Sequence, residues 1–329
     1  MLKYIFRRIL YIILIMFLIT SVIFFIYRTM PGDPVDIYLP PELAFAMNPY
    51  ELEAQRAEII RTLGLDQPHH IQYFLWLGQM LRGNFGISMQ TRTPVVEHIR
   101  GPMARTMIMS FVTMVIIFAI TIPAGIYSAV KRGKLFDKSA LVGSMIGLSI
   151  PTFLFALILI VIFSVILGWL PIMGLEPPMP PDRGTLAWFM ARVRHMVLPV
   201  MALVLTGMAG LIRYTRSAMI DSLNMDCIRT ARSKGLAEKT VIYVHALRNA
   251  MILMITVMAG WIIGIFGGSL VIEITFAWNG MGLVMFQALN TRDIGVLMTM
   301  TVFYSSISFT GVLLMDIAYV IADPRIRFE

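Results

Sequence analysis

The sequence has one cysteine and few charged residues for its length. Cys227 is the only cysteine among 329 residues, so no disulfide bond can form within the chain. Charged residues make up 14% of the chain and hydrophobic residues 58%, which is too few charges and too many apolar residues for an ordinary soluble domain. These shortages exclude a disulfide-stabilised secreted domain and a typical water-soluble enzyme.

The motifs of the common catalytic classes are also absent. No Gly-x-x-x-x-Gly-Lys-Ser/Thr occurs, so the chain has no P-loop with which to hydrolyse ATP. No Ser/His/Asp arrangement at a strand-to-helix turn and no His-Glu-x-x-His helix occurs either. We therefore expect a chain that is not an enzyme, with no catalytic residue, no metal site and no cofactor of its own.

Three features offer other interpretations. The adjacent His69 and His70 are interpreted as solvated loop histidines rather than metal ligands, and the 27 methionines as gap fillers within apolar runs. The formal net charge of +8 could indicate nucleic-acid binding. Basic residues also gather in the cytoplasmic loops of membrane proteins, so we expect a lipid bilayer and no nucleic acid.

Six apolar runs approach the ~20 residues that a membrane-spanning helix needs. They predict an all-α integral membrane protein with six transmembrane helices. Span 1 lies within residues 1–30 and ends at the helix breaker Pro31-Gly-Asp-Pro34; residues 31–102 form a long external loop, and residues 103–329 form a five-span core. Short helices are expected in the external loop at 51–63 and 72–81, and the later spans at 106–130, 139–170 with a kink at Pro151, 196–212, 250–272 and 294–315.

Basic residues are unevenly distributed among the segments that join the spans. The two termini, the turn Lys131–Lys138 and the segment 217–249 hold most of the Lys and Arg residues, whereas the remaining segments are close to neutral. By the positive-inside rule, the basic segments face the cytoplasm. We expect a multi-pass protein of the inner or plasma membrane with both termini in the cytoplasm.

A polar stretch, residues 217–249, separates the fourth and fifth apolar runs. Asn224 or Asp226 can cap a helix that begins there, and Gly235 stands where such a helix ends in the left-handed conformation. A second helix is expected to begin near Ala237. Two short helices joined by a glycine elbow indicate a docking element for a partner, although an ordinary basic loop has the same composition.

The docking stretch resembles a known motif. Arg229-Thr-Ala-Arg-Ser-Lys-Gly-Leu236, followed by His245-Ala-Leu-Arg-Asn-Ala250, is similar to the EAA loop of ABC-importer permeases. Ala231, Gly235 and Leu247 match the general pattern. Arg229-Thr230, His245 and Arg248 depart from it in the way that is usual in the dipeptide/oligopeptide/nickel branch.

Segments outside the docking stretch resemble the same branch. They are Pro31-Gly-Asp-Pro34, Gly267-Gly-Ser-Leu-Val-Ile-Glu-Ile-Thr-Phe-Ala-Trp-Asn-Gly-Met-Gly282, with Asn279 where the branch usually has proline, and Asp323-Pro-Arg-Ile-Arg327. The resemblance covers essentially the whole chain and implies a peptide permease subunit of the B type with a type I ABC-importer fold.

The resemblance also implies partners. They are a second homologous permease subunit that completes a heterodimer, two cytoplasmic ATP-binding subunits that bind ATP and Mg, and an extracellular solute-binding protein that is lipid-anchored or periplasmic. On this basis the chain forms half of a translocation pathway for di- or oligopeptides. Alternatives are the same machine importing nickel or oligosaccharides, and a stand-alone membrane enzyme or channel.

Two groups of residues become candidate sites. Contact with the ATP-binding subunits is expected from the coupling loop, 217–249, through Asp226, Cys227, Ile228, Arg229, Ala231, Arg232, Gly235 and Leu236. Because span 5 lines the pore in relatives, pore or substrate contacts are expected at Gly264, Gly267, Gly268 and Glu273. Helix packing is the alternative role of the glycines, and an ion pair with Arg292 is the alternative role of Glu273.

The single cysteine allows a direct test of the topology. If residues 217–249 face the cytoplasm, a membrane-impermeant thiol reagent applied to intact cells leaves Cys227 unlabelled, and the same reagent labels it once the membrane is opened. Labelling in intact cells would contradict this topology.

Overall fold

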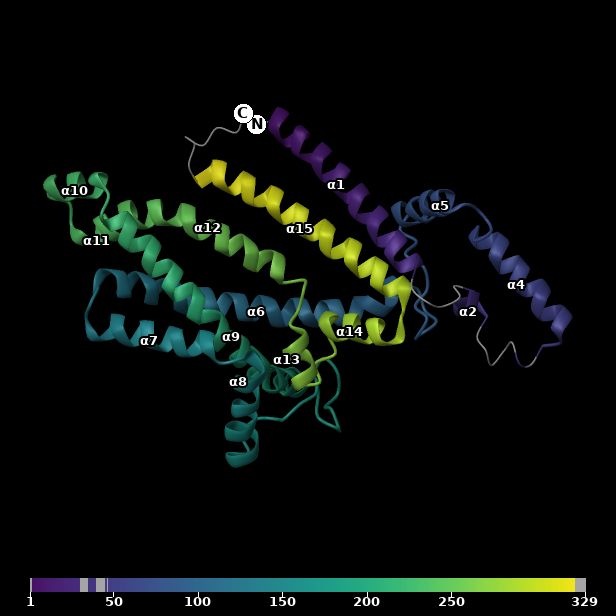
Figure 1. The fold of residues 1–329 in the computed structure, drawn as a ribbon. Coiled ribbons are helices and arrows are strands. Elements are labelled where there is room, and N and C mark those ends of the chain that lie inside the picture. The colour runs from purple at the N-terminus through teal and green to yellow at the C-terminus, as the bar shows by residue number, and fades with distance from the viewer. Residues whose placement is uncertain (1, 30–34, 40–44, 46, 323–329) are drawn as a thin grey trace. The chain divides into compact units, whose positions relative to one another are not determined.

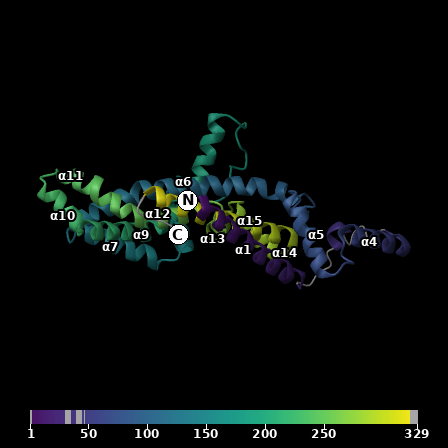
Figure 2. The same cartoon turned by 90° about the horizontal axis from the view of Figure 1, so that it is seen from above.

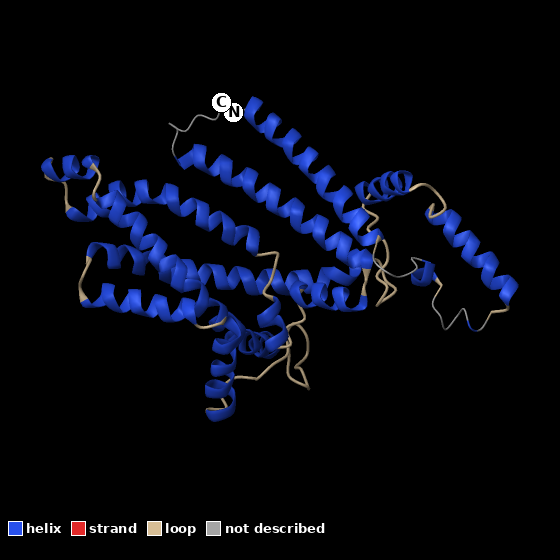
Figure 3. Ribbon diagram, in the orientation of Figure 1, coloured by secondary structure: helices blue, strands red, loops and turns tan. Residues whose placement is uncertain are grey.

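The computed structural model describes residues 2–29, 35–39, 45 and 47–322, and the chain forms two compact units. The larger unit holds residues 102–283 with the end of the chain from residue 307, and the smaller unit holds residues 2–101 with 284–306. The described residues form helices and loops without a β-strand (Figure 3), apart from one isolated bridge between Ile87 and Pro94. The expected all-α fold is confirmed.

The helices follow one another along the whole described chain. In order they are α1 (Leu2–Arg28), α2 (Val35–Tyr38), α4 (Pro49–Leu63), α5 (His69–Leu81), α6 (Val95–Val130), α7 (Leu135–Ser149), α8 (Thr152–Leu159), α9 (Leu186–Leu223), α10 (Asp226–Ser233), α11 (Glu238–Thr240), α12 (Leu247–Gly264), α13 (Leu270–Thr275), α14 (Met281–Thr291) and α15 (Ile294–Ala322), with π-helical segments at Ile160–Ile166 and Val241–Ala246.

The number of helices that are long and apolar enough to cross a membrane agrees with the expected six spans when each bent helix pair is counted as one span. Within the described residues, four helices are long and apolar enough to cross a bilayer, and two bent helix pairs raise the number to six. The four are Phe6–Tyr27, Val95–Val130, Leu186–Leu223 and Ile294–Ile317. The prediction of a polytopic membrane protein therefore holds, with different boundaries.

The two bent spans have identifiable breaks. α7 meets the helix formed by Thr152–Ile166 at an angle of 101°, and Pro151 stands between them. Ile150 has the extended backbone that a residue before proline adopts. The expected kink at Pro151 is present as a full change of direction, which turns α8 away from α7 in both views (Figures 1 and 2). The second pair, Glu238–Met251 and Met254–Gly264, meets at 61°.

The predicted fourth and fifth spans differ most clearly from the helices of the structure. The fourth span was expected at 196–212, but α9 has 38 residues because the helix continues through charged residues at both ends of the apolar run. The fifth span was expected to reach Ile272, but α12 ends at Gly264, and a turn of Ile265–Ser269 precedes α13. Hydropathy marks where side chains are apolar, whereas a helix ends where its backbone hydrogen bonds end.

α9 is the central helix of the larger unit. It packs against α7, α8 and α12, which lie beside it in Figure 1. Close approach needs small residues: a Cβ atom on Gly125 of α6 would lie 2.6 Å from Cβ of Thr215, and one on Gly147 of α7 would lie 2.9 Å from Cβ of Ala209. Glycine at helix contacts is typical of membrane helix packing, so side-chain size here sets the helix spacing.

The smaller unit joins α1 and α5 through aromatic and polar contacts. The Tyr73 hydroxyl lies 2.9 Å from Thr20 Oγ1, and the rings of Tyr73 and Phe24 pack edge to face at 5.5 Å. At the start of α15, Asp293 accepts hydrogen bonds from Ser88 Oγ at 2.6 Å and from the Gln90 backbone at 3.2 Å. The loop before α6 is therefore fixed to the beginning of α15.

The expected short helices of the first loop are present. α4 begins after Asn48, whose side chain accepts a hydrogen bond from the Glu51 backbone, and it ends at Gly64 with φ +64°. His69 and His70 are exposed as expected, but they open α5 instead of lying in a loop. The predicted breaker Pro31–Pro34 and the motif Asp323–Arg327 lie outside the described residues.

Candidate coupling site and cavity

α10 is a short amphipathic helix attached to the end of α9. Ile228 and Ala231 are buried, at 0% and 6% exposure, on the face that turns toward the rest of the larger unit. The opposite face is exposed. Figures 1 and 2 both place α10 beyond the ends of α7 and α9, so one face of α10 belongs to the core and the other is presented outward.

The buried face of α10 belongs to one apolar cluster. Its members come from three long helices and a π-helical segment as well as from α10 itself. They are Ile126 and Ala129 of α6, Ala218 and Met219 of α9, Ile228 and Ala231, Val241, Ile242 and Ala246 of the π-helical segment, and Ala250 and Met254 of α12. Ser222 Oγ also donates to the Ala246 carbonyl at 2.6 Å. α10 is therefore packed into the bundle and does not hang from a free loop.

The exposed face of α10 is polar with a few apolar atoms. Asp226, Cys227, Arg229, Arg232 and Leu236 are all exposed. The Arg232 guanidinium pairs with the Glu238 carboxylate at 2.6 Å, which raises the pKa of Arg232. Arg229 lies 3.5 Å from Asp226, one turn earlier. Exposed pairs of this kind contribute only ~0–1 kcal/mol to stability, so these side chains remain available to a partner.

Gly235 forms the expected elbow. Its φ is +73°, and the Gly235 N–H donates to the Arg232 carbonyl while the Leu236 N–H donates to the Ala231 carbonyl. These two bonds are the pattern of a Schellman motif, which satisfies the last carbonyls of a helix. The next helix begins at Glu238, close to the expected position at Ala237. The prediction of two short helices joined at Gly235 is confirmed.

Two details of the coupling prediction are wrong. Neither Asn224 nor Asp226 caps α10: Asn224 ends α9, Asp226 is the first residue of α10, and Met225 precedes it without a side-chain cap. Ile228 was expected to offer an apolar contact to a partner, but its side chain is fully buried within this chain. Ala231 is likewise covered, so the exposed contact surface is narrower than predicted.

An ion pair that the sequence did not predict joins the same end of the bundle. Arg216 of α9 donates two hydrogen bonds to Asp137 of α7, at 2.5 Å and 2.9 Å. The Asp137 carboxylate, 2% exposed, also accepts from Ser128 Oγ of α6 and from the Gly133 backbone. These contacts fix α6, α7 and α9 to one another beside the α10 cluster.

Glu273, one of the predicted pore residues, lies in a buried hydrogen-bonded site. It is fully buried, and its carboxylate accepts hydrogen bonds from Thr106 Oγ1 at 2.9 Å and from the Leu283 backbone at 2.8 Å. Burial raises the pKa of Glu273, and these hydrogen bonds partly oppose the shift. A Cβ atom on Gly280 would lie 2.5 Å from this carboxylate, so glycine is needed where the loop closes around it. The side-chain and backbone groups that bind the Glu273 carboxylate are therefore Thr106 and Leu283.

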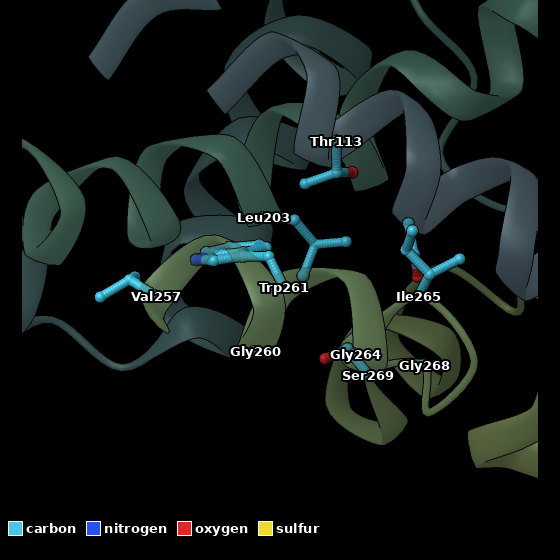
Figure 4. A pocket seen from close by; sticks show the side chains of 10 residues that line it. Thr113, Leu203, Val257, Gly260, Trp261, Gly264, Ile265, Gly268 and Ser269 are labelled. Atoms are coloured by element: carbon cyan, nitrogen blue, oxygen red, sulfur yellow. The ribbon is translucent and has the colours of Figure 1, made fainter. Parts of the chain in front are cut away.

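A cavity of about 340 Å³ opens among α6, α9 and α12 (Figure 4). Two of the four predicted pore residues, Gly264 and Gly268, line it, whereas Gly267 and Glu273 do not. Sequence reasoning missed most of its wall, because nothing local marks a cavity-facing residue on an apolar helix. Besides Gly260 of α12, the remaining wall residues are Ser110 and Thr113 of α6, Leu203 of α9, Val257 and Trp261 of α12, and Ile265 and Ser269 beyond it.

The family of the chain follows from comparison with known proteins. Residues 121–328 match the family described as the binding-protein-dependent transport system inner membrane component. The chain belongs to this family. Residues 1–110 of the permease match the N-terminal region described for the same type of membrane component. The permease is therefore a multi-pass inner-membrane protein that works with a solute-binding protein.

Relatives of the permease match along its whole length. It is 40% identical to the oligopeptide transport system permease protein AppB of Bacillus subtilis (strain 168), over 100% of both chains. It is 34% identical to the di/tripeptide transport system permease protein DppB of Pseudomonas aeruginosa (strain UCBPP-PA14), again over 100% of both. A chain from inward-facing structures of the MetNI methionine ABC transporter aligns with a TM-score of 0.48 at 20% identity, over 66% of this chain and 94% of that chain.

The buried ion pair leads to a stability prediction. Asp137→Ala removes the partner of the half-buried Arg216 and should cost about 3–5 kcal/mol, because an uncompensated charge stays in the packed bundle. The double variant Asp137→Leu/Arg216→Met removes both charges and should cost much less. The measurement is the thermal unfolding midpoint of the purified permease in detergent.

An exposed aspartate supplies the control. Asp226→Ala breaks the pair with Arg229 on the surface of α10 and should leave the midpoint nearly unchanged, since exposed pairs are worth ~0–1 kcal/mol. Equal losses for Asp137→Ala and Asp226→Ala would show that the buried pair does not hold the helices together.

Proposed function

We propose that the permease is the membrane subunit of an ATP-driven importer of di- and oligopeptides. The support for peptide cargo is that AppB and DppB, which match it over their whole lengths, are named as oligopeptide and di/tripeptide permeases. In this proposal a solute-binding protein delivers the peptide, and a second, homologous permease completes the pathway. Two cytoplasmic ATP-binding subunits supply the energy, because this chain has no P-loop.

The exposed face of α10 is the proposed seat for an ATP-binding subunit. Cys227, Arg229 and Arg232 offer polar and cationic atoms on a helix whose other face is anchored by Ile228, and the exposed Leu236 follows the elbow. Because the buried face of α10 is packed against α6, α9 and α12, a movement of α10 is expected to displace these helices instead of only rotating α10 about its two connecting turns. This single observation, an amphipathic helix with its apolar face already buried in the chain's own core, carries the coupling role.

The position of α10 also fixes the proposed orientation. If α10 meets ATP-binding subunits, it lies in the cytoplasm together with the basic turn Lys131–Lys138, and both termini lie on that side. The cavity beside Gly260 and Gly264 then lies farther along the same helices toward the outer face. Rigid helices that satisfy their own backbone hydrogen bonds are suited to carry movement between the two places.

The cargo prediction is tested with the whole complex in vesicles. Uptake of a labelled di- or oligopeptide should require the permease, its partner permease, the ATP-binding subunits, ATP and the binding protein together. Omitting the binding protein or replacing ATP by a non-hydrolysable analogue should abolish it. Uptake of nickel or an oligosaccharide in place of peptide would contradict the proposed cargo, and activity of the isolated chain would favour a channel or an enzyme.

The coupling role is tested at the Gly235 elbow. Gly235→Val places a β-branched residue at φ +73°, where an L-residue costs roughly 1–2 kcal/mol or more, although a Cβ atom at this position would meet nothing within 4 Å. We expect membrane insertion to persist and the pose of α10 to change, so that fewer ATP-binding subunits co-purify or less peptide is transported per ATP hydrolysed.

The matched control is Gly184→Val, in the loop before α9. Gly184 also has a positive φ, +85°, and open space around its missing side chain, so the substitution introduces similar strain away from α10. Wild-type co-purification and coupling for both variants would show that the elbow at Gly235 is an ordinary loop.

A further inference from the structure

In the described part of the chain, two buried threonines of the long helices, Thr113 and Thr215, have hydroxyls without a hydrogen-bond partner, and of these only Thr113 lines the cavity. Threonine in a helix commonly donates to a carbonyl one turn earlier, as Thr121 does to Ile117 at 2.7 Å on the same helix. Thr113 is 2% exposed and lines the cavity, yet its Oγ1 has no hydrogen-bond partner among the described residues. A buried hydroxyl without a partner is costly, so a ligand that supplies one is favoured at this position.

The wall around Thr113 is polar in places but carries no charge. Figure 4 shows Thr113 projecting from α6 toward Trp261 and Leu203, with Ser269 on the segment that follows α12. None of the side chains that line the cavity is acidic, basic or histidine. A charged peptide terminus placed there would lose its hydration without gaining a counter-ion, whereas a peptide amide and an apolar side chain would find hydroxyls, an indole ring and aliphatic groups.

The size of the cavity limits what it can take. Its volume of about 340 Å³ is at the small end of the ~300–1,000 Å³ range of ligand pockets. Gly260 and Gly264 add to the space, because a Cβ atom on either would meet nothing within 4 Å. The cavity therefore suits a short peptide segment, and a side chain introduced at Gly260 would extend into free space instead of clashing.

We propose that this cavity binds an uncharged internal stretch of the transported peptide. The Thr113 hydroxyl bonds to a peptide backbone group, and the side chain of the bound residue packs against Trp261 and Leu203. This inference rests on the proposed function and deepens it, since it names the part of the peptide that the permease itself contacts. Selection by size at an internal peptide position is then a property of the permease, separate from selection by the binding protein.

The experiment measures uptake of tripeptides that differ only in the middle residue: glycine, alanine, leucine or phenylalanine. Each variant is assembled with the same partners and binding protein, so changes in the ratio of leucine to glycine peptide uptake report on the permease. Gly260→Leu should lower this ratio by roughly tenfold, near the lower limit of discrimination by a hydrophobic pocket. Gly260→Ala should lower it less, and the phenylalanine peptide should be affected most.

A second variant tests the hydroxyl. Thr113→Val keeps the side-chain shape and removes the oxygen, so it should raise the peptide concentration at half-maximal uptake about fivefold for every middle residue, as expected for one lost hydrogen bond. If the hydroxyl has no role in binding peptide, Thr113→Val should leave the peptide concentration at half-maximal uptake unchanged. The thermal unfolding midpoint should then rise, because an unpaired buried hydroxyl has been removed.

The control is Gly143→Leu on α7, where the glycine is also helical with open space around it but does not line the cavity. Its leucine-to-glycine uptake ratio should equal that of the wild type.

Two results would contradict the proposed subsite while leaving peptide import intact. One is an equal uptake ratio for the wild type and both Gly260 variants, and the other is an equal loss of uptake for all four peptides. If Gly260→Leu does not assemble, Gly260→Ala is judged by the same criterion. Absence of uptake of any peptide by the wild-type complex would overturn the proposed function and the subsite with it.

Discussion

The packing of α9 against α7, α8 and α12 is the interaction on which the larger unit depends. Glycines at the crossings let the helices approach until backbone and small side chains touch, as between Gly147 and Ala209. Lipid offers no hydrophobic gain for such contacts, so close packing and polar pairs must hold the helices together. The pair Asp137–Arg216 supplies the polar part at the end that carries α10.

The need for hydrogen-bond partners also shapes the place where the helices break. Buried backbone groups need partners, so a helix can be interrupted in the interior where other groups replace the lost hydrogen bonds. Between α12 and α14 the chain leaves the regular helix, and Glu273 accepts the hydrogen bond of the Leu283 N–H while Thr106 accepts that of the Met281 N–H. A buried acid in this segment is thus a substitute for helix hydrogen bonds. Its position beside small residues reflects how tightly the loop folds around a carboxylate.

Local patterns predicted what depends on local chemistry. The elbow at Gly235 and the break at Pro151 follow from the backbone freedom of glycine and the ring of proline, and both are present. Contacts between distant residues were not predictable in this way. Asp137 and Arg216 are 79 positions apart, and in the sequence each is only one more charged residue in or next to a basic segment between apolar runs. Ile228 was expected to contact a partner, but it is buried in the chain's own core. The sequence of a short amphipathic helix does not reveal whether the core or a partner covers its apolar side.

The cavity and the α10 cluster are built from the same three helices. α6 contributes Thr113 to the cavity and Ile126 to the cluster, α9 contributes Leu203 and Met219, and α12 contributes Gly260 and Ala250. On α9 the two contributing residues are about 24 Å apart at the helical rise of 1.5 Å per residue. Close-packed interiors transmit strain between neighbouring helices. The three shared helices are therefore a continuous packed connection along which the coupling proposed for α10 would reach the wall of the cavity.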